Sequence, residues 1–251
     1  MLNCMLLKKY FIAIIIIFSI LPLNAQLHPV CDSASLIQHQ YFSLCYNEKT
    51  EQADWVFHFI TPERLKNKVT SRSDDFRPDK KIKTGSAELK DYKGSGYDRG
   101  HLCPAGDMGF DSTAMSESFL MSNMSPQEPG FNRGIWNSLE QRIRNWGLLF
   151  DTLFIITGPI FYDTAYSFIG ENKVAIPDAC YKVLLGKKTD KFYTIGFIIP
   201  NSEGLKNYLS YCETIDRVEE LTGLDFFSSL NDTTEKQIEE SYSCFFINGK
   251  D

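Results

Sequence analysis

The segment GSGYDRGHLCPAGDM, residues 94–108, places an acid, a base and an imidazole within four positions, at Asp98, Arg99 and His101. Imidazole is the side chain best suited to proton transfer near neutral pH. Arginine presents a planar fork that matches a phosphate group. The flanking glycines would let a ligand approach the backbone closely. A lone histidine is more often structural than catalytic, but this combination predicts a reactive loop.

A second segment, FNRGIWNSLEQRIRNWG (131–147), predicts the clearest helix of the chain, with apolar residues on one face and polar residues on the other. Asn132 and Glu140 lie eight residues apart, which is about 12 Å along a helix. We therefore expect Asn132 to bind a cation directly and Glu140 to hold it through water. A hard cation that keeps most of its waters, such as Mg²⁺, suits so sparse an oxygen site. Arg144, four residues after Glu140, can pair with it, and the alternative is an ordinary amphipathic helix with an exposed Glu–Arg pair.

The rest of the chain reads as several strands that rarely alternate with helices. A helix is expected after Thr61 as N-cap and Pro62 as first helical residue. Residues 68–97 are polar and basic and are expected to form mostly loop. We predict an α+β fold with a mostly antiparallel central sheet and flanking helices, in one domain from residue 26 to 251. The predicted strands are 41–47 and 54–60 (a hairpin), 152–162, 181–186 and 192–200, and the late helices are 214–223 and 233–242.

The N-terminus has the composition of a secretory signal peptide. Lys8 and Lys9 precede an apolar run of roughly 14 residues, which is shorter than the about 20 that a membrane-spanning helix needs, and small residues follow up to Ala25. We expect residues 1–25 to be cleaved, which gives a secreted or periplasmic protein without a membrane segment. The alternative is an uncleaved N-terminal anchor.

Charge is distributed unevenly along the chain. The chain has a net charge of −6, and the loss of Lys8 and Lys9 would make it about −8, a poor starting point for nucleic-acid binding. Eleven basic residues nevertheless lie between Arg64 and Arg99. They form either a solvated loop or a surface that attracts phosphates.

Six cysteines would remain after cleavage, an even number that suggests disulfides in an exported protein. Their pairing cannot be chosen from the sequence. A zinc site at His101 and Cys103 is disfavoured because no CxxC or HxxxH partner lies nearby, so Cys103 is expected in a disulfide or as a buried thiol. The six are Cys31, Cys45, Cys103, Cys180, Cys212 and Cys244.

Three motifs occur in a fixed order: DRGH (98–101), SNMSPQ (122–127) and FNRGIWNSLE (131–140). Together they resemble the DNA/RNA non-specific endonuclease family, and the resemblance covers most of the chain after the signal peptide. It implies a ββα-metal (His-Me finger) active site. It also implies hydrolysis of DNA and RNA without sequence preference, with Mg²⁺ as cofactor, Mn²⁺ as a substitute and 5′-phosphate products.

The resemblance also implies roles for individual residues. His101 would be the general base, Asn132 the Mg²⁺ ligand and Glu140 the acid beside the metal. Arg99 and Arg144 would offset the charge of the phosphate. Asp98 is expected to support its loop and Asn123 to support the site. A further arginine from the preceding loop would be Arg72, with Arg77 as its rival.

Two other functions fit parts of the sequence. A protein of this fold could bind nucleic acid without cleaving it, but the presence of His101, Asn132 and Glu140 argues against a binding-only function. A metal-dependent phosphodiesterase for small molecules is disfavoured by the long basic segment, which favours a polymer. The sequence leaves open whether the protein forms a homodimer.

Overall fold

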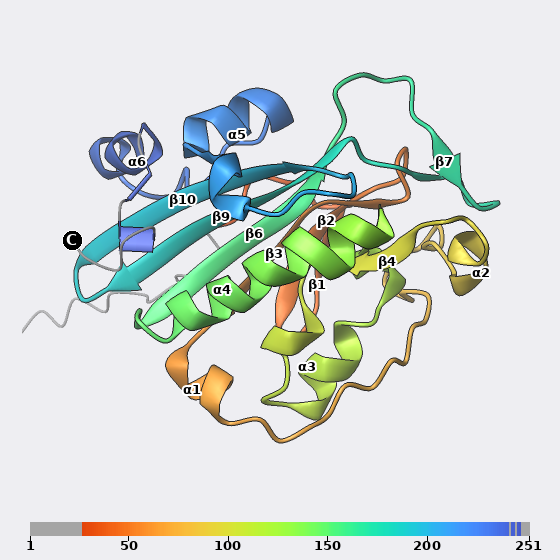
Figure 1. The fold of residues 1–251 in the computed structure, drawn as a ribbon, viewed down its shortest axis with the longest axis horizontal. Coiled ribbons are helices and arrows are strands. Elements are labelled where there is room, and N and C mark those ends of the chain that lie inside the picture. Colours follow the sequence, from red (N-terminus) through yellow and green to blue (C-terminus); the bar gives the residue numbers. More distant parts are fainter. Residues whose placement is uncertain (1–26, 241, 244, 247–251) are drawn as a thin grey trace, which may run out of the picture.

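The computed structural model describes residues 27–240, 242–243 and 245–246. The predicted signal peptide and Cys244 lie outside these residues. The described chain forms a central sheet with helices on both faces (Figure 1).

Seven strands form the central sheet in the order β1-β2-β3-β6-β9-β10-β11 (Figure 1). Every neighbouring pair is antiparallel, which confirms the predicted α+β class. All five segments predicted as strands lie in this sheet, and the first two form the predicted hairpin, β2 with β3. The strands are β1 (Leu36–Gln38), β2 (Phe42–Asn47), β3 (Gln52–Ile60), β6 (Thr152–Ile160), β9 (Ala179–Lys188), β10 (Lys191–Pro200) and β11 (Cys212–Glu213).

The two faces of the sheet are covered by different helices. Side chains alternate between faces along a strand, so Leu153 and Phe154 of β6 belong to different cores. On one face Leu153 packs with apolar residues of α4 (Asn137–Gly147). On the other face Phe154 belongs to a core shared with α5 (Ile215–Thr222) and α6 (Asp232–Glu239). The sheet thus separates α4 from α5 and α6, as Figure 1 shows.

Local sequence signals define the ends of several helices. The short helix α1 (Pro62–Lys66) begins as predicted, because the Thr61 hydroxyl accepts a hydrogen bond from the Arg64 N–H. Helix α5 is capped in the same way by Thr214, and it ends at Gly223, whose φ of 68° is the left-handed conformation that favours glycine.

A two-stranded sheet carries the DRGH motif. β4 (Asp98–His101) pairs with β5 (Met124–Gln127), although the glycine-rich sequence predicted a loop. Only the residues just before it form a turn, where Gly94 and Gly96 have φ of 74° and 87°. Gly100 is needed for a different reason than ligand approach. A Cβ atom at Gly100 would lie 2.0 Å from the Gln127 Cδ atom, so the neighbouring strand occupies the space.

The remaining elements are short. Residues 68–97 are mostly irregular, as predicted, apart from α2 and an isolated bridge between Arg77 and Leu120. The other elements are α2 (Leu89–Tyr92), α3 (Ser112–Glu117), β7 (Phe168–Ile169), β8 (Val174–Ala175), the π-helical turn η4 (Phe131–Trp136), and the 3₁₀ turns η2 (Ala105–Asp107), η3 (Met121–Asn123) and η5 (Tyr208–Tyr211).

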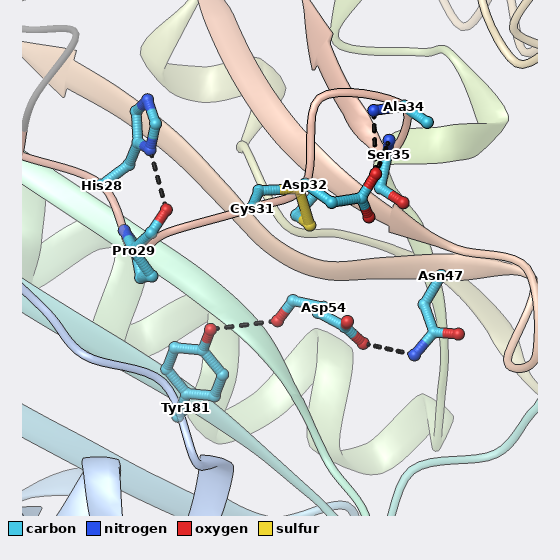
Figure 2. Close-up of a disulfide and its surroundings, with 10 residues drawn as sticks. His28, Pro29, Cys31, Asp32, Ala34, Ser35, Asn47, Asp54 and Tyr181 are labelled. Carbon is cyan, nitrogen blue, oxygen red and sulfur yellow. Dashed lines mark hydrogen bonds between the residues drawn. A yellow bond between two sulfur atoms is a disulfide. The ribbon is translucent and has the colours of Figure 1, made fainter.

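A disulfide joins Cys31 to Cys45 of β2, with a Cα–Cα distance of 5.9 Å (Figure 2). It ties the N-terminal segment of the described chain to β2, the strand next to the edge strand β1. Cys103 and Cys180 are buried free thiols, and Cys212 is a partly exposed one. The expectation of a buried thiol at Cys103 therefore holds, and the disulfide alternative there is wrong.

Candidate active site

A polar cavity of about 390 Å³ brings together six of the predicted site residues. They come from three segments: the loop before α2, strand β4, and the helix formed by η4 and α4. Asn123 does not line this cavity. The lining residues are Arg72, Arg99, His101, Pro104, Ala105, Gly106, Asn132, Arg133, Asn137, Glu140 and Arg144.

His101, at the end of β4, packs against two aromatic rings that also contact each other. Its ring makes edge contacts with Phe76 and Phe119, at centroid distances of 5.7 Å and 5.0 Å. Burial lowers the pKa of His101 to about 3, and the charges of Arg72 and Arg99 act in the same direction. Nε2 is buried and has no hydrogen-bond partner. The imidazole is therefore neutral at physiological pH and has a free nitrogen that can accept a proton.

The same two rings hold the two arginines beside His101. The guanidinium of Arg99 lies over Phe76, 4.3 Å from the ring centroid, and its Nε is buried without a partner. That of Arg72 lies over Phe119 at 4.8 Å. Cation–π contacts of this kind fix a guanidinium while leaving its N–H donors available. Two positive charges are thus held beside the imidazole, where a phosphate group could be bound.

The structure distinguishes the two rival arginines of the basic loop. Arg72 reaches the cavity, and its Nε also donates to Asp74 Oδ1 at 2.6 Å on the exposed side. Arg77 points elsewhere, because its Nη1 donates to the Asp75 carboxylate and to the Ser116 carbonyl. Arg72 is therefore the arginine of this loop that faces the site.

Asp98 orients the amide of Asn132. The Asn132 Nδ2 donates to Asp98 Oδ2 at 2.9 Å, so its Oδ1 is the atom left for a ligand in the cavity. Arg133 holds both oxygens of the same carboxylate, with its Nε donating to Oδ2 at 2.8 Å and its Nη2 to Oδ1 at 2.6 Å. The predicted support role of Asp98 thus has a definite form: it joins β4 to η4 and fixes one amide orientation.

The helix that carries Asn132 and Glu140 is not regular. Over η4 the Asn137 N–H donates to the Asn132 carbonyl, a spacing of five residues, and Gly134 has non-helical angles (φ −98°, ψ −106°). One residue is thus inserted into the α-helical register. At about 100° per residue, positions eight apart in a regular helix would differ by about 80°, whereas the insertion makes them equivalent to positions seven apart, about 20° from alignment. The kinked helix brings both Asn132 and Glu140 to the cavity.

A buried network of charged groups lies behind Glu140. Burial raises the pKa of Glu140 to about 7, although the positive charge of Lys182 opposes the shift. Arg144 was predicted to pair with Glu140, but in the described chain its Nη1 donates to Asp107 Oδ1 at 3.0 Å. The other oxygen of Asp107, Oδ2, is hydrogen-bonded to His58 Nε2 at 3.0 Å. The pairing prediction is wrong because a buried carboxylate from another segment lies within reach of the arginine.

Sequence reasoning missed three members of this network: His58, Asp107 and Lys182. The Lys182 ammonium is buried, donates to Thr157 Oγ1 at 2.9 Å and lies over the Trp136 ring. Burial lowers its pKa. Two signals were available in the sequence: Lys182 is a single lysine in the otherwise apolar strand 181–186, and Asp107 is an acid within the segment 94–108.

Asn123 supports the loop after His101 from behind. Its Oδ1 accepts from the Cys103 N–H at 2.8 Å, and its Nδ2 donates to the carbonyls of Cys103 and Ser118. The side chain is fully buried, so it positions this backbone and does not face the cavity. Burial raises the pKa of the Cys103 thiol well above its ordinary value, which leaves it unreactive.

Comparison with known proteins gives a consistent result. The model of the DNA/RNA non-specific endonuclease family matches residues 24–233. Mitochondrial endonuclease G of Caenorhabditis elegans is 35% identical over 83% of this chain and 77% of its own length. Nuclease C1 of Cunninghamella echinulata var. echinulata is 33% identical over 79% of this chain and 84% of its own. A solved structure of the EndoG/EndoGI complex matches with a TM-score of 0.74 and 32% identity over 79% of this chain and 88% of that chain.

An antiparallel sheet whose ββα unit gathers an imidazole, arginines and an Asn–Glu pair defines a nuclease. The chain belongs to the DNA/RNA non-specific endonuclease family. The endonuclease G relative carries a mitochondrial name, so the family itself does not indicate secretion. In the part of the chain that the structure describes, no helix has both the length and the apolar character to cross a membrane.

Proposed function

We propose that this chain is an exported, Mg²⁺-dependent nuclease that hydrolyses DNA and RNA without sequence preference and leaves 5′-phosphates. One observation carries the proposal. His101, Asn132, Glu140 and the three arginines Arg72, Arg99 and Arg144, drawn from distant segments, line a single cavity.

The donor atoms of this cavity fit a hard divalent cation. The Asn132 Oδ1 faces a possible ligand because Nδ2 is committed to Asp98. The Glu140 carboxylate receives no hydrogen bond that shifts its pKa, so its oxygens are available to a cation or to the water around one. Mg²⁺ accepts such a site because it keeps several waters and needs few protein ligands. When bound, it would supply positive charge at the phosphate and at the leaving 3′-oxygen.

The chain's own residues would do the rest. His101, neutral at physiological pH, takes a proton from a water that attacks the phosphorus. Arg99 and Arg72, fixed on their aromatic rings, bind the non-bridging oxygens. Arg144 is held at the cavity by Asp107 and adds a third positive charge. These contacts reach only the backbone of a nucleic acid, which explains cleavage without sequence preference.

The surface beside the cavity favours a polymeric substrate over a small molecule. Two further hollows share residues with it: one continues from Arg72 to Lys68, and the other from Arg144 to Lys66 and Lys68. The basic segment therefore extends the site on one side. Other members of the segment lie elsewhere, as Lys90 does in its pairs with Glu88 and Glu171.

Export is supported by the disulfide between Cys31 and Cys45, since such bonds persist in oxidising compartments (Figure 2). Mass determination of the mature protein tests cleavage after Ala25. Light scattering on the same sample tests whether the protein forms a homodimer.

A nicking assay tests the nuclease proposal. Supercoiled plasmid and a structured RNA are incubated with the protein in Mg²⁺, in Mn²⁺ and in excess EDTA. We expect both substrates to be cut with either metal and neither in EDTA, and the ends to be ligatable 5′-phosphates. Cutting that persists in EDTA would overturn the metal dependence.

Three variants separate the residue roles. His101→Ala should lower the rate by several orders of magnitude while DNA binding persists, and near-normal cleavage would remove His101 as base. Arg72→Ala should lower the rate by about tenfold or more. Arg77→Ala is its matched control and should leave cleavage near normal, because Arg77 faces Asp75 and Ser116.

A further inference from the structure

A second group of acids lies on the opposite face of the sheet from the active site. Asp216 and Glu219 of α5 and Glu239 of α6 each offer one carboxylate oxygen, and these three oxygens lie within 4.8 Å of one another. Both helices pack over the core that contains Phe154, whereas α4 packs over the other core. The group therefore bridges two helices at a place that the nuclease chemistry does not use (Figure 1).

Glu239 gives the second, independent indication of a ligand. Its exposed fraction is 8%, and its Oε1 is buried with no hydrogen-bond partner. A buried carboxylate without a partner is costly, so native proteins almost always pair it or bind it to a metal. This one points into the space that Asp216 and Glu219 also face.

The basic residues of the two helices do not neutralise this group. Arg217 of α5 pairs with Glu220, and Lys236 of α6 pairs with Glu240. The largest charge effects on Glu239 within the described residues come from acids: Asp216 and Glu219 of the group, together with Asp225 and Glu235. The negative potential of this group would favour a bound cation.

We propose that Asp216, Glu219 and Glu239 bind a hard divalent cation of the calcium type, which joins α5 to α6. Ca²⁺ binds oxygens at about 2.3–2.6 Å, so two of its ligands are at most about 5 Å apart, and the three oxygens satisfy this limit as they stand. Ca²⁺ also accepts a site completed by water. The position of Glu219 is already fixed, because its Oε1 accepts a hydrogen bond from the Phe226 N–H at 2.8 Å.

The site is structural and independent of the proposed nuclease mechanism. It connects two helices that cover the core on the far face, and no catalytic candidate contributes to it. Occupancy should therefore change stability and leave the Mg²⁺-dependent cleavage rate unchanged.

Thermal unfolding of the mature protein tests the proposal, with CaCl₂ added after EDTA treatment and removal. At a hundredfold excess over Kd we expect the Tm to rise by about 5–10 °C. Glu239→Gln should show no rise with calcium. Asp216→Asn, at an exposed position that tolerates substitution, should lose the rise as well.

Two controls assign the rise to this site. Asn132→Ala, on the active-site face, should keep it, and so should Glu220→Gln, which removes an acid of α5 outside the group. Calorimetric titration should show one calcium ion fewer in Glu239→Gln than in wild type. The proposal is overturned if wild type shows no rise, if Glu239→Gln and Asp216→Asn keep it, or if Asn132→Ala loses it.

Discussion

Replacing Asp98 by asparagine should weaken Mg²⁺ binding without removing any group from the cavity. Asp98 accepts a hydrogen bond from the Asn132 Nδ2 at 2.9 Å, and this bond turns Oδ1 toward the site. An asparagine at position 98 can donate as well as accept, so the Asn132 amide would be free to reverse. A hydrogen bond to a charged acceptor contributes about 1.5–3 kcal/mol. At about 1.4 kcal/mol per factor of ten, the metal concentration for half-maximal rate should rise about 10–100-fold.

The assay is the initial rate of plasmid nicking as a function of Mg²⁺ concentration. The maximal rate should largely return at saturating Mg²⁺, because the catalytic groups remain. Arg133→Ala is the matched control: it removes the exposed partner of the same carboxylate and should shift the curve less than about threefold. If Asp98→Asn lowers the maximal rate with an unchanged half-saturation concentration, Asp98 does not act through Asn132 and the reasoning fails.

Three further outcomes follow from the described contacts. His101 has a pKa of about 3 in the fold and about 6.5 when unfolded, so between these pH values protons bind to the unfolded chain and favour it. As the pH falls from 6 to 4, wild type should therefore lose about 1.4 kcal/mol of unfolding free energy per pH unit relative to His101→Gln. Parallel stability curves for the two proteins would contradict this. Replacing Cys31 and Cys45 together by serine opens a loop with a sequence separation of 14 and should cost about 3 kcal/mol in chemical denaturation, and reduction of wild type should reproduce the loss. Asn123→Ala leaves buried backbone groups of the loop after His101 unpaired and should cost about 3 kcal/mol or more, whereas an unchanged denaturation midpoint would refute its support role.

The parts of the fold that depend on local signals could be predicted from the sequence. The hairpin of β2 and β3 follows from two short runs rich in aromatic and β-prone residues, and α1 follows from Thr61 and Pro62. The DRGH strand could not be predicted in this way. Its glycine-rich composition favours a turn, and it is a strand only because β5, more than twenty residues further on, pairs with it and fills the space beside Gly100.

In the candidate site, too, some features could be predicted from the sequence and others depend on tertiary contacts. Residue types and their order identified the six side chains that meet in the cavity, chiefly through resemblance to a family. What lies behind them depends on tertiary contacts that no spacing reveals. Arg144 turns to Asp107 and away from Glu140, and Lys182 reaches the network from a strand in the middle of the sheet.

The π turn in η4 also bears on how far apart Asn132 and Glu140 need to be in the sequence. A π turn is an α-helix with one extra residue, and a single insertion is the simplest way to make one. Without that residue Asn132 and Glu140 would be seven positions apart in a regular helix, about two turns, and would still share a face. Relatives that lack the insertion should therefore keep the same site with a spacing one residue shorter. A sequence pattern written for this site should allow that gap to vary by one.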